Sequence, residues 1–254
     1  MTLDKGSLVL LDYTARVKDT NEIFETTKEE DAKKSDHFDP TRKYQPRLVS
    51  VGDGWVLKGL DEALTKADIG SQMNVELTPD KAFGERDPAK VRMIPQRKLG
   101  DKADEVSVGD VIDVDDRTGI VRFVGSGRIQ VDFNHRLAGR TLVYDVNVVK
   151  KLETDNEKVS ALVKRWLPID DDKLKFAISD EQLEMDLPEE TYQMEGLQSV
   201  KAGIARDIFK NVSKVKKVKY VETISAPQQP KPAPEPAQST EAAAKEQEKP
   251  AEAK

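Results

Sequence analysis

The segment that begins Gly52-Asp53-Gly54-Trp55 constrains the fold most, because it couples a tight turn to a short apolar helix. The two glycines permit a positive φ, a backbone conformation that other residues rarely adopt. Apolar residues then recur at helical spacing for about two turns. They are Trp55, Val56, Leu57, Leu60, Ala63 and Leu64. A helix this short is unstable alone in water, so it has to pack against other segments. On periodicity alone it is an ordinary core helix.

Short segments of alternating apolar and polar residues surround this helix and predict strands. They cover residues 7–18, 22–27, 47–51, 73–77 and 136–152. Residues 28–46 between two of them are charged and polar, and we expect them to form an ordered loop. The loop begins with Thr27-Lys28-Glu29-Glu30, whose spacing matches a capping box and predicts a helical turn or two.

Together with the short helix, four segments in order along the chain resemble the FKBP family of peptidyl-prolyl cis/trans isomerases. They are residues 9–15 (VLLDYTA), 22–27 (EIFETT), 82–84 (AFG) and 134–146 (NHRLAGRTLVYDV). In that family the central helix forms the floor of a proline-binding pocket, and the other segments form its walls. The resemblance therefore implies an α+β fold in which an antiparallel half-barrel sheet wraps around the short helix.

The isomerase domain is expected to comprise residues 1–87 and 134–152, interrupted by an excursion over residues 88–133. Three strand-like runs lie in this excursion, at residues 110–115, 119–124 and 128–133, with good turn sequences between them. A loop of about 45 residues without secondary structure would be uncommon, so we predict a small β subdomain. Its position resembles the insert-in-flap domain of SlyD-like FKBPs, which implies that it binds unfolded chains.

Residues 153–225 are predicted to form a separate α+β domain with the element order α-β-β-α-β. Its first helix begins with the capping box Thr154-Asp155-Asn156-Glu157, and Pro168 ends it. The size and position of this domain resemble the C-terminal domain of long archaeal FKBPs, which implies an interaction module that forms a homodimer. Residues 226–254 are rich in Pro, Ala and Glu, a composition typical of a disordered tail.

The composition argues against several functional classes. A net charge of −6 disfavours a protein that mainly binds nucleic acid, because phosphate contacts need a basic surface. Contact of the basic segment 214–219 with ribosomal RNA or an acidic partner is a minor alternative. No apolar run approaches the ~20 residues of a membrane span, and no signal-peptide pattern is present, so we expect a cytoplasmic location. The two histidines, His37 and His135, are far apart, so neither a metal nor a cofactor is predicted.

Prolyl isomerisation must overcome a barrier of ~18–20 kcal/mol, because the amide loses its resonance as it rotates. An apolar pocket removes water from the imide, and donors around the twisted bond stabilise the transition state. The resemblance implies that the backbone N–H of Leu57 binds the substrate carbonyl beside proline and that Glu25 polarises or orients this carbonyl. It also implies a pocket lined by Tyr13, Phe24, Val56, Leu57, Leu60, Phe83 and Tyr144, with His135 and Leu137 at its rim.

Three positions depart from the pattern of minimal FKBPs. Glu25 replaces an aspartate and is one methylene longer, and Phe83 lacks the hydroxyl of a tyrosine at that position. Leu60 replaces a tryptophan, as it does in SlyD-like members. Two hypotheses therefore stand. The first is a prolyl isomerase with chaperone activity toward unfolded or nascent polypeptides; the second is a non-catalytic binding protein with a vestigial pocket.

Overall fold

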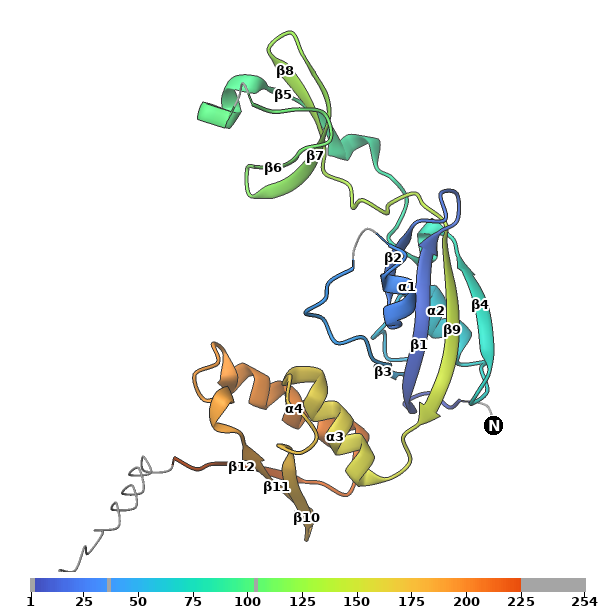
Figure 1. Cartoon of the computed structure of the whole chain (residues 1–254), viewed down its shortest axis with the longest axis vertical. Coiled ribbons are helices and arrows are strands. Elements are labelled where there is room, and N and C mark those ends of the chain that lie inside the picture. Colours follow the sequence, from blue (N-terminus) through green and yellow to red (C-terminus); the bar gives the residue numbers. More distant parts are fainter. Residues whose placement is uncertain (1–2, 36–37, 103–104, 225–254) are drawn as a thin grey trace, which may run out of the picture. The chain divides into compact units, whose positions relative to one another are not determined.

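The computed structural model describes residues 3–35, 38–102 and 105–224 of the chain. The strands of these residues form three sheets, of five, three and four strands, accompanied by short α-helices (Figure 1). This α+β architecture with mainly antiparallel sheets confirms the predicted fold class. The tail predicted to be disordered, residues 226–254, lies outside the described residues.

The five-stranded sheet is organised around β1, which pairs along nearly its whole length with β9. β2 and β3 share the opposite edge of β1, with β2 on its C-terminal half and β3 on its N-terminal half. β4 pairs with the far edge of β9, and every pairing in this sheet is antiparallel. The strands are β1 (Leu8–Val17), β2 (Ile23–Thr26), β3 (Arg47–Ser50), β4 (Gln72–Leu77) and β9 (Leu142–Lys151).

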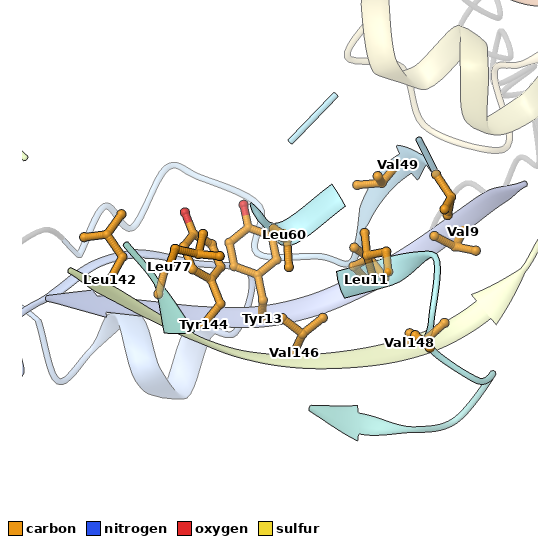
Figure 2. Packing of buried hydrophobic residues seen from close by; sticks show 14 of the residues in the cluster. Val9, Leu11, Tyr13, Val49, Leu60, Leu77, Leu142, Tyr144, Val146 and Val148 are labelled. Atoms are coloured by element: carbon orange, nitrogen blue, oxygen red, sulfur yellow. The ribbon is translucent and has the colours of Figure 1, made fainter. Parts of the chain in front are cut away.

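One face of this sheet carries the main apolar core. Because side chains alternate across a strand, Val9, Leu11 and Tyr13 of β1 all point to this face, and all three are buried. Figure 2 shows them beside side chains from β9 and β3, with Leu60 of α2 (Lys58–Leu64) next to the ring of Tyr13. The short helix predicted from the sequence is therefore packed, as its length requires.

The helix begins at Lys58, so the prediction that Trp55, Val56 and Leu57 belong to it is wrong. The reason is the turn before it. The buried carboxylate of Asp61 accepts hydrogen bonds from the backbone N–H groups of Gly52 (2.7 Å) and Gly54 (2.8 Å). Both glycines have positive φ, as expected. This clamp shapes an irregular segment, which carries its apolar side chains to the core without helical geometry.

The excursion forms its own four-stranded antiparallel sheet, in the order β5-β8-β7-β6. Its small core includes Ile94, Val114, Ile129 and Val131. The sequence predicted three of these strands and missed β5, whose pattern is broken by charge and proline. The strands are β5 (Val91–Pro95), β6 (Val111–Val114), β7 (Arg117–Gly125) and β8 (Arg128–Asp132). The turn between β6 and β7 is shorter than predicted: two residues with positive φ, Asp115 and Asp116, form it.

The two ends of the excursion are hydrogen-bonded to each other. The side chain of Asn134 accepts from the backbone N–H of Asp87 and donates to its carbonyl, both at 2.9 Å. The Phe133 N–H donates to the Lys90 carbonyl at 3.0 Å. The buried carboxylate of Asp132 accepts from Asn134 and pairs with an arginine that precedes the excursion, Arg86. The excursion thus leaves and rejoins the chain at one closed junction.

The polar segment after β2 contains α1 (Glu29–Ala32), which confirms a helical turn there. The predicted capping box is wrong. The N-cap residue is Lys28, without a side-chain cap, because the Thr27 hydroxyl donates instead to Asp12 at 2.9 Å. That contact ties the segment to β1.

The C-terminal elements appear in the predicted order, α-β-β-α-β. The Thr154–Glu157 capping box is present, and the helix it begins ends before Pro168. β10 pairs with β11 antiparallel, and β11 pairs with β12 parallel. The elements are α3 (Asp155–Trp166), β10 (Lys175–Ser179), β11 (Gln182–Leu187), α4 (Leu197–Asn211) and β12 (Lys217–Glu222). Short 3₁₀ turns lie at Pro79–Lys81, Pro88–Lys90, Gln96–Lys102 and Glu189–Thr191. None of the described helices is long and apolar enough to span a bilayer.

We predict that Gly203→Ala destabilises the protein, although alanine is the better helix former. Gly203 lies inside α4, and a Cβ there would meet the ring of Trp166 at 2.6 Å. Overpacking of this kind costs about 1–3 kcal/mol, more than the ~1 kcal/mol that helix propensity returns. Denaturant unfolding measures the difference.

Ala202→Gly, at the exposed neighbouring position, is the control and should cost about 1 kcal/mol by propensity alone. A Gly203→Ala variant more stable than the wild type would contradict the close contact of α4 with Trp166.

Candidate functional site

A cavity of about 250 Å³ opens between α2, the segment before it and the aromatic side chains of β1 and β9. This volume lies below the ~300–1,000 Å³ of typical small-molecule sites and suits a single residue of a polypeptide. The cavity is lined by Tyr13, Glu25, Arg47, Trp55, Val56, Leu57, Leu60, Phe83 and Tyr144. Seven of the residues predicted for the pocket are among these, so segments far apart in sequence meet here.

The remaining predicted residues surround this cavity without lining it. Phe24 packs edge-on against the ring of Tyr144, with centroids 6.0 Å apart. His135 stacks on Phe83, with centroids 4.1 Å apart and an interplanar angle of 12°. Leu137 is buried in the core of the five-stranded sheet and its helix. Partial desolvation by its neighbours and the charge of Arg136 lower the pKa of His135, so this largely exposed side chain is neutral at pH 7.

A hydrogen-bonded triad forms the polar side of the cavity. The Tyr13 hydroxyl donates to Glu25 at 2.7 Å, and Arg47 donates to both the Tyr13 hydroxyl and the Glu25 carboxylate at 3.0 Å. Burial, reinforced by the charge and hydrogen bond of Glu25, raises the pKa of Tyr13 to about 12. The phenol is therefore neutral at pH 7, and the triad holds one charge of each sign beside the apolar wall.

Tyr144 presents a second neutral phenol to the cavity. Its ring lies 5.7 Å from that of Tyr13, and Figure 2 shows both hydroxyls pointing to the same side. Burial raises its pKa further than that of Tyr13, with the charge of Glu25 as a lesser cause. Within the described part of the chain, no protein group is hydrogen-bonded to the Tyr144 hydroxyl. A donor is thus present in the cavity although Phe83 has no hydroxyl.

The backbone N–H of Leu57 is the second donor on the cavity wall. Leu57 is the N-cap of α2, and its carbonyl accepts from the N–H of Asp61 at 2.9 Å. Among residues 3–35, 38–102 and 105–224, no group accepts a hydrogen bond from the Leu57 N–H. This amide is therefore open to a ligand carbonyl.

Sequence reasoning missed two residues that line the cavity, Arg47 and Trp55. Arg47 reaches the site because β3 pairs with β1, which sets Arg47 opposite Leu11 and beside Tyr13. The register between two strands depends on tertiary structure, and no local sequence pattern predicts it. Trp55 was assigned to an ordinary helix face, and its position in the irregular segment instead turns its ring toward the cavity. The rarity of tryptophan, with two in the chain, was the one available signal.

Comparison with known proteins identifies the family of this chain. The family model described as FKBP-type peptidyl-prolyl cis-trans isomerase matches residues 1–149, more than half of the chain. A second model, described as FKBP26 C-terminal, matches residues 155–225. The chain belongs to the FKBP-type peptidyl-prolyl cis-trans isomerase family.

Its FKBP relatives include isomerases from archaea and bacteria. The chain is 30% identical over 146 residues to the short-type peptidyl-prolyl cis-trans isomerase of Methanocaldococcus jannaschii, covering 58% of this chain and 92% of the relative. It is 32% identical over 111 residues to the FKBP-type 16 kDa isomerase of Escherichia coli, covering 42% and 74%. A SlyD isomerase of Helicobacter pylori is 25% identical over 130 residues, covering 50% and 70%. The FKBP part of the chain is thus an isomerase fold with an aromatic cavity.

We predict that Glu25→Gln lowers the pKa of Tyr13 from about 12 toward its ordinary 10.0. The carboxylate raises this pKa because it repels the phenolate and accepts the phenol proton, and an amide removes the charge. Burial keeps the value above 10.0. NMR titration of carbon-13-labelled tyrosine measures it.

Glu62→Gln is the control, because Glu62 lies on α2 and pairs with Lys81 rather than with Tyr13. An unchanged Tyr13 pKa in Glu25→Gln would show that the triad does not form in solution.

Proposed function

We propose that this FKBP-type isomerase rotates X-Pro bonds in the cavity beside α2, and that the inserted four-stranded sheet holds the unfolded polypeptide meanwhile. The single observation that carries the first part is the open Leu57 N–H on the wall of an aromatic cavity. A proline ring fits a small apolar cavity, and its preceding carbonyl needs one donor. Neither a nucleophile nor a cofactor takes part in this chemistry.

Catalysis follows from differential binding of the twisted bond. The planar imide is polar because of its resonance, so removing water from it favours the less polar twisted state. The rings of Tyr13, Phe83 and Tyr144 supply that dry surface. In this proposal the Leu57 N–H anchors the carbonyl beside proline, and the Tyr144 hydroxyl is a second donor in the same cavity. Donors that are fixed before reaction stabilise the transition state without reorganisation.

Glu25 acts in this proposal through its partners. Its carboxylate holds the Tyr13 hydroxyl and Arg47 in place, and both of these border the cavity. The extra methylene relative to aspartate is accommodated because Arg47 bridges the carboxylate and the phenol. Glu25 therefore orients the polar rim that meets the substrate carbonyl.

We predict that Leu57→Pro lowers kcat/KM for a short X-Pro peptide by about tenfold or more, since one hydrogen bond contributes up to about 1.5 kcal/mol net. The φ of Leu57 is −55°, which proline adopts, so the substitution removes the N–H without forcing the backbone angle of residue 57. A protease-free cis-to-trans assay measures the rate.

Leu57→Ala is the matched variant, since it shortens the side chain and keeps the N–H; it should lose only a fewfold. Equal losses in both variants would contradict the anchoring role. A wild-type rate equal to that of buffer would favour the alternative, a non-catalytic binding protein.

The chaperone part of the proposal is supported by exposed apolar side chains within the insert. Met93, Val108, Val111 and Phe123 are exposed by 48, 63, 68 and 51%. Apolar surface gathered on a subdomain with a small core of its own is suited to transient contact with unfolded chains. Some of the relatives are SlyD-type isomerases, in agreement with this role.

We predict that Met93→Ser combined with Phe123→Ser slows the assisted refolding of a protein whose folding is limited by prolyl isomerisation. Both side chains are exposed, so the change removes client contacts without emptying a core. Turnover of a short peptide should stay at the wild-type rate. Refolding followed by intrinsic fluorescence of the client measures the effect.

Val149→Ser is the control, because Val149 is 42% exposed on β9 outside the insert. Loss of both activities together would show that the insert belongs to the catalytic fold, and unchanged refolding would remove the chaperone assignment.

We infer that the chain is divided as the sequence suggests. The isomerase domain is residues 1–87 and 134–152, the client-binding insert is residues 88–133, and residues 153–225 form an interaction domain. The separate sheets of these segments support the division. We also propose that residues 153–225 form a homodimer, for which the exposed side chain of Phe209 on α4 is a suitable contact. The proposed location of the protein is the cytoplasm.

A further inference from the structure

Trp55 belongs to two packing clusters at once. Its half-buried ring lines the candidate cavity and packs against the core of the five-stranded sheet. The same ring also packs against the cluster formed by α3, α4 and the C-terminal strands. It stands two residues before Leu57, whose open N–H carries the proposed anchoring role. Whatever fixes the Trp55 ring therefore restricts the segment that presents this N–H.

Arg165 of α3 fixes that ring. Its guanidinium carbon lies 3.8 Å from the centroid of the Trp55 ring, a cation–π contact at close range. The guanidinium is itself held, because it donates to Asp207 of α4 at 2.7 Å. The same Asp207 oxygen accepts from the indole N–H of Trp166 at 2.7 Å, and the Asp207 side chain is only 14% exposed. These hydrogen bonds hold the Arg165 guanidinium in place against the Trp55 ring.

A second contact holds the same segment from α4. Lys210 pairs with Asp53 at 2.8 Å, and Asp53 also accepts from the Ser50 hydroxyl. Although burial opposes ionisation, the hydrogen bonds of Lys210 and Ser50 lower the pKa of Asp53, so the pair stays charged at pH 7. Asp53 lies inside the glycine turn, two residues before Trp55. The two C-terminal helices therefore grip both the turn and the tryptophan that follows it.

We propose that α3 and α4 hold the segment from Ser50 to Leu57 in its binding-competent conformation, with Arg165 as a positioning residue that acts through Trp55. This rests on the proposed role of the Leu57 N–H. It gives the C-terminal domain a part in catalysis that is independent of client binding or dimerisation. Without the Arg165 contact, a smaller fraction of the molecules has the binding-competent conformation. The apparent dissociation constant for the substrate rises in inverse proportion to that fraction.

The test is the kinetics of full-length Arg165→Gln with a short X-Pro tetrapeptide, which is too small to engage other surfaces. KM should rise roughly three- to tenfold, the range expected for losing one cation–π contact, while kcat stays unchanged. Arg165→Lys keeps the charge and should recover part of the loss. Arg206→Gln is the control, an exposed arginine on α4, and should match the wild type.

A merely structural role of Arg165 predicts the opposite split. It would reduce the amount of folded enzyme, so kcat would fall with KM unchanged, and that result overturns the proposal. Unchanged KM and kcat in Arg165→Gln overturn it as well.

The amide signal of Leu57 in nitrogen-15 NMR spectra gives a readout that needs no catalysis. In Arg165→Gln, but not in Arg206→Gln, this signal and the Trp55 indole signal should shift and broaden. If Leu57 is unaffected, the inference fails even when the wild type is active. If the wild type does not accelerate isomerisation, the proposed function fails, and the Leu57 signal still decides whether the C-terminal helices position the segment.

Discussion

The site depends on one buried carboxylate. Asp61 is 8% exposed, and its carboxylate accepts hydrogen bonds from the backbone N–H groups of Gly52 and Gly54. A buried charge that loses such partners is costly, so the turn and the helix cannot separate cheaply. Because Asp61 lies in α2 and its partners lie in the turn before it, the carboxylate fixes the direction in which the chain enters the helix. The position of the Leu57 N–H follows from that direction.

Around this clamp, the sheet supplies a surface that is apolar without being inert. Tyr13 and Tyr144 come from paired strands, and burial keeps both phenols neutral. Both therefore contribute dry ring surface, and Tyr144 adds a hydroxyl donor, whereas the Tyr13 hydroxyl already donates to Glu25. Among the described residues that line the cavity, the charged ones are Glu25 and Arg47. These two form an ion pair, and both are hydrogen-bonded to the Tyr13 hydroxyl. Such a site can lower the polarity around an imide without the cost of an isolated charge.

Strand alternation and the order of the motifs predicted much of this architecture. The features they missed depend on tertiary contacts. The alternation in β1 indicated its buried face, and resemblance brought Phe83 and Tyr144 to one pocket. The start of α2 was misplaced because apolar residues reach the core from helical and irregular backbone alike. β5 was missed because Arg92 and Pro95 interrupt its pattern, while pairing with β8 stabilises it. Arg47 enters the site only through strand register, which no local pattern encodes.

The closed junction at Asp87 and Asn134 has a consequence for how such a protein can change over time. Two side-chain hydrogen bonds and one backbone bond join the ends of the insert, so the host sheet meets the same short closure whatever lies beyond it. The entropy of closing a loop grows only slowly with its length once its ends are fixed. Segments of different size and surface can therefore be exchanged at this point while β4 and β9 keep their register. The surface that the insert presents can thus change without any change in the residues that line the cavity.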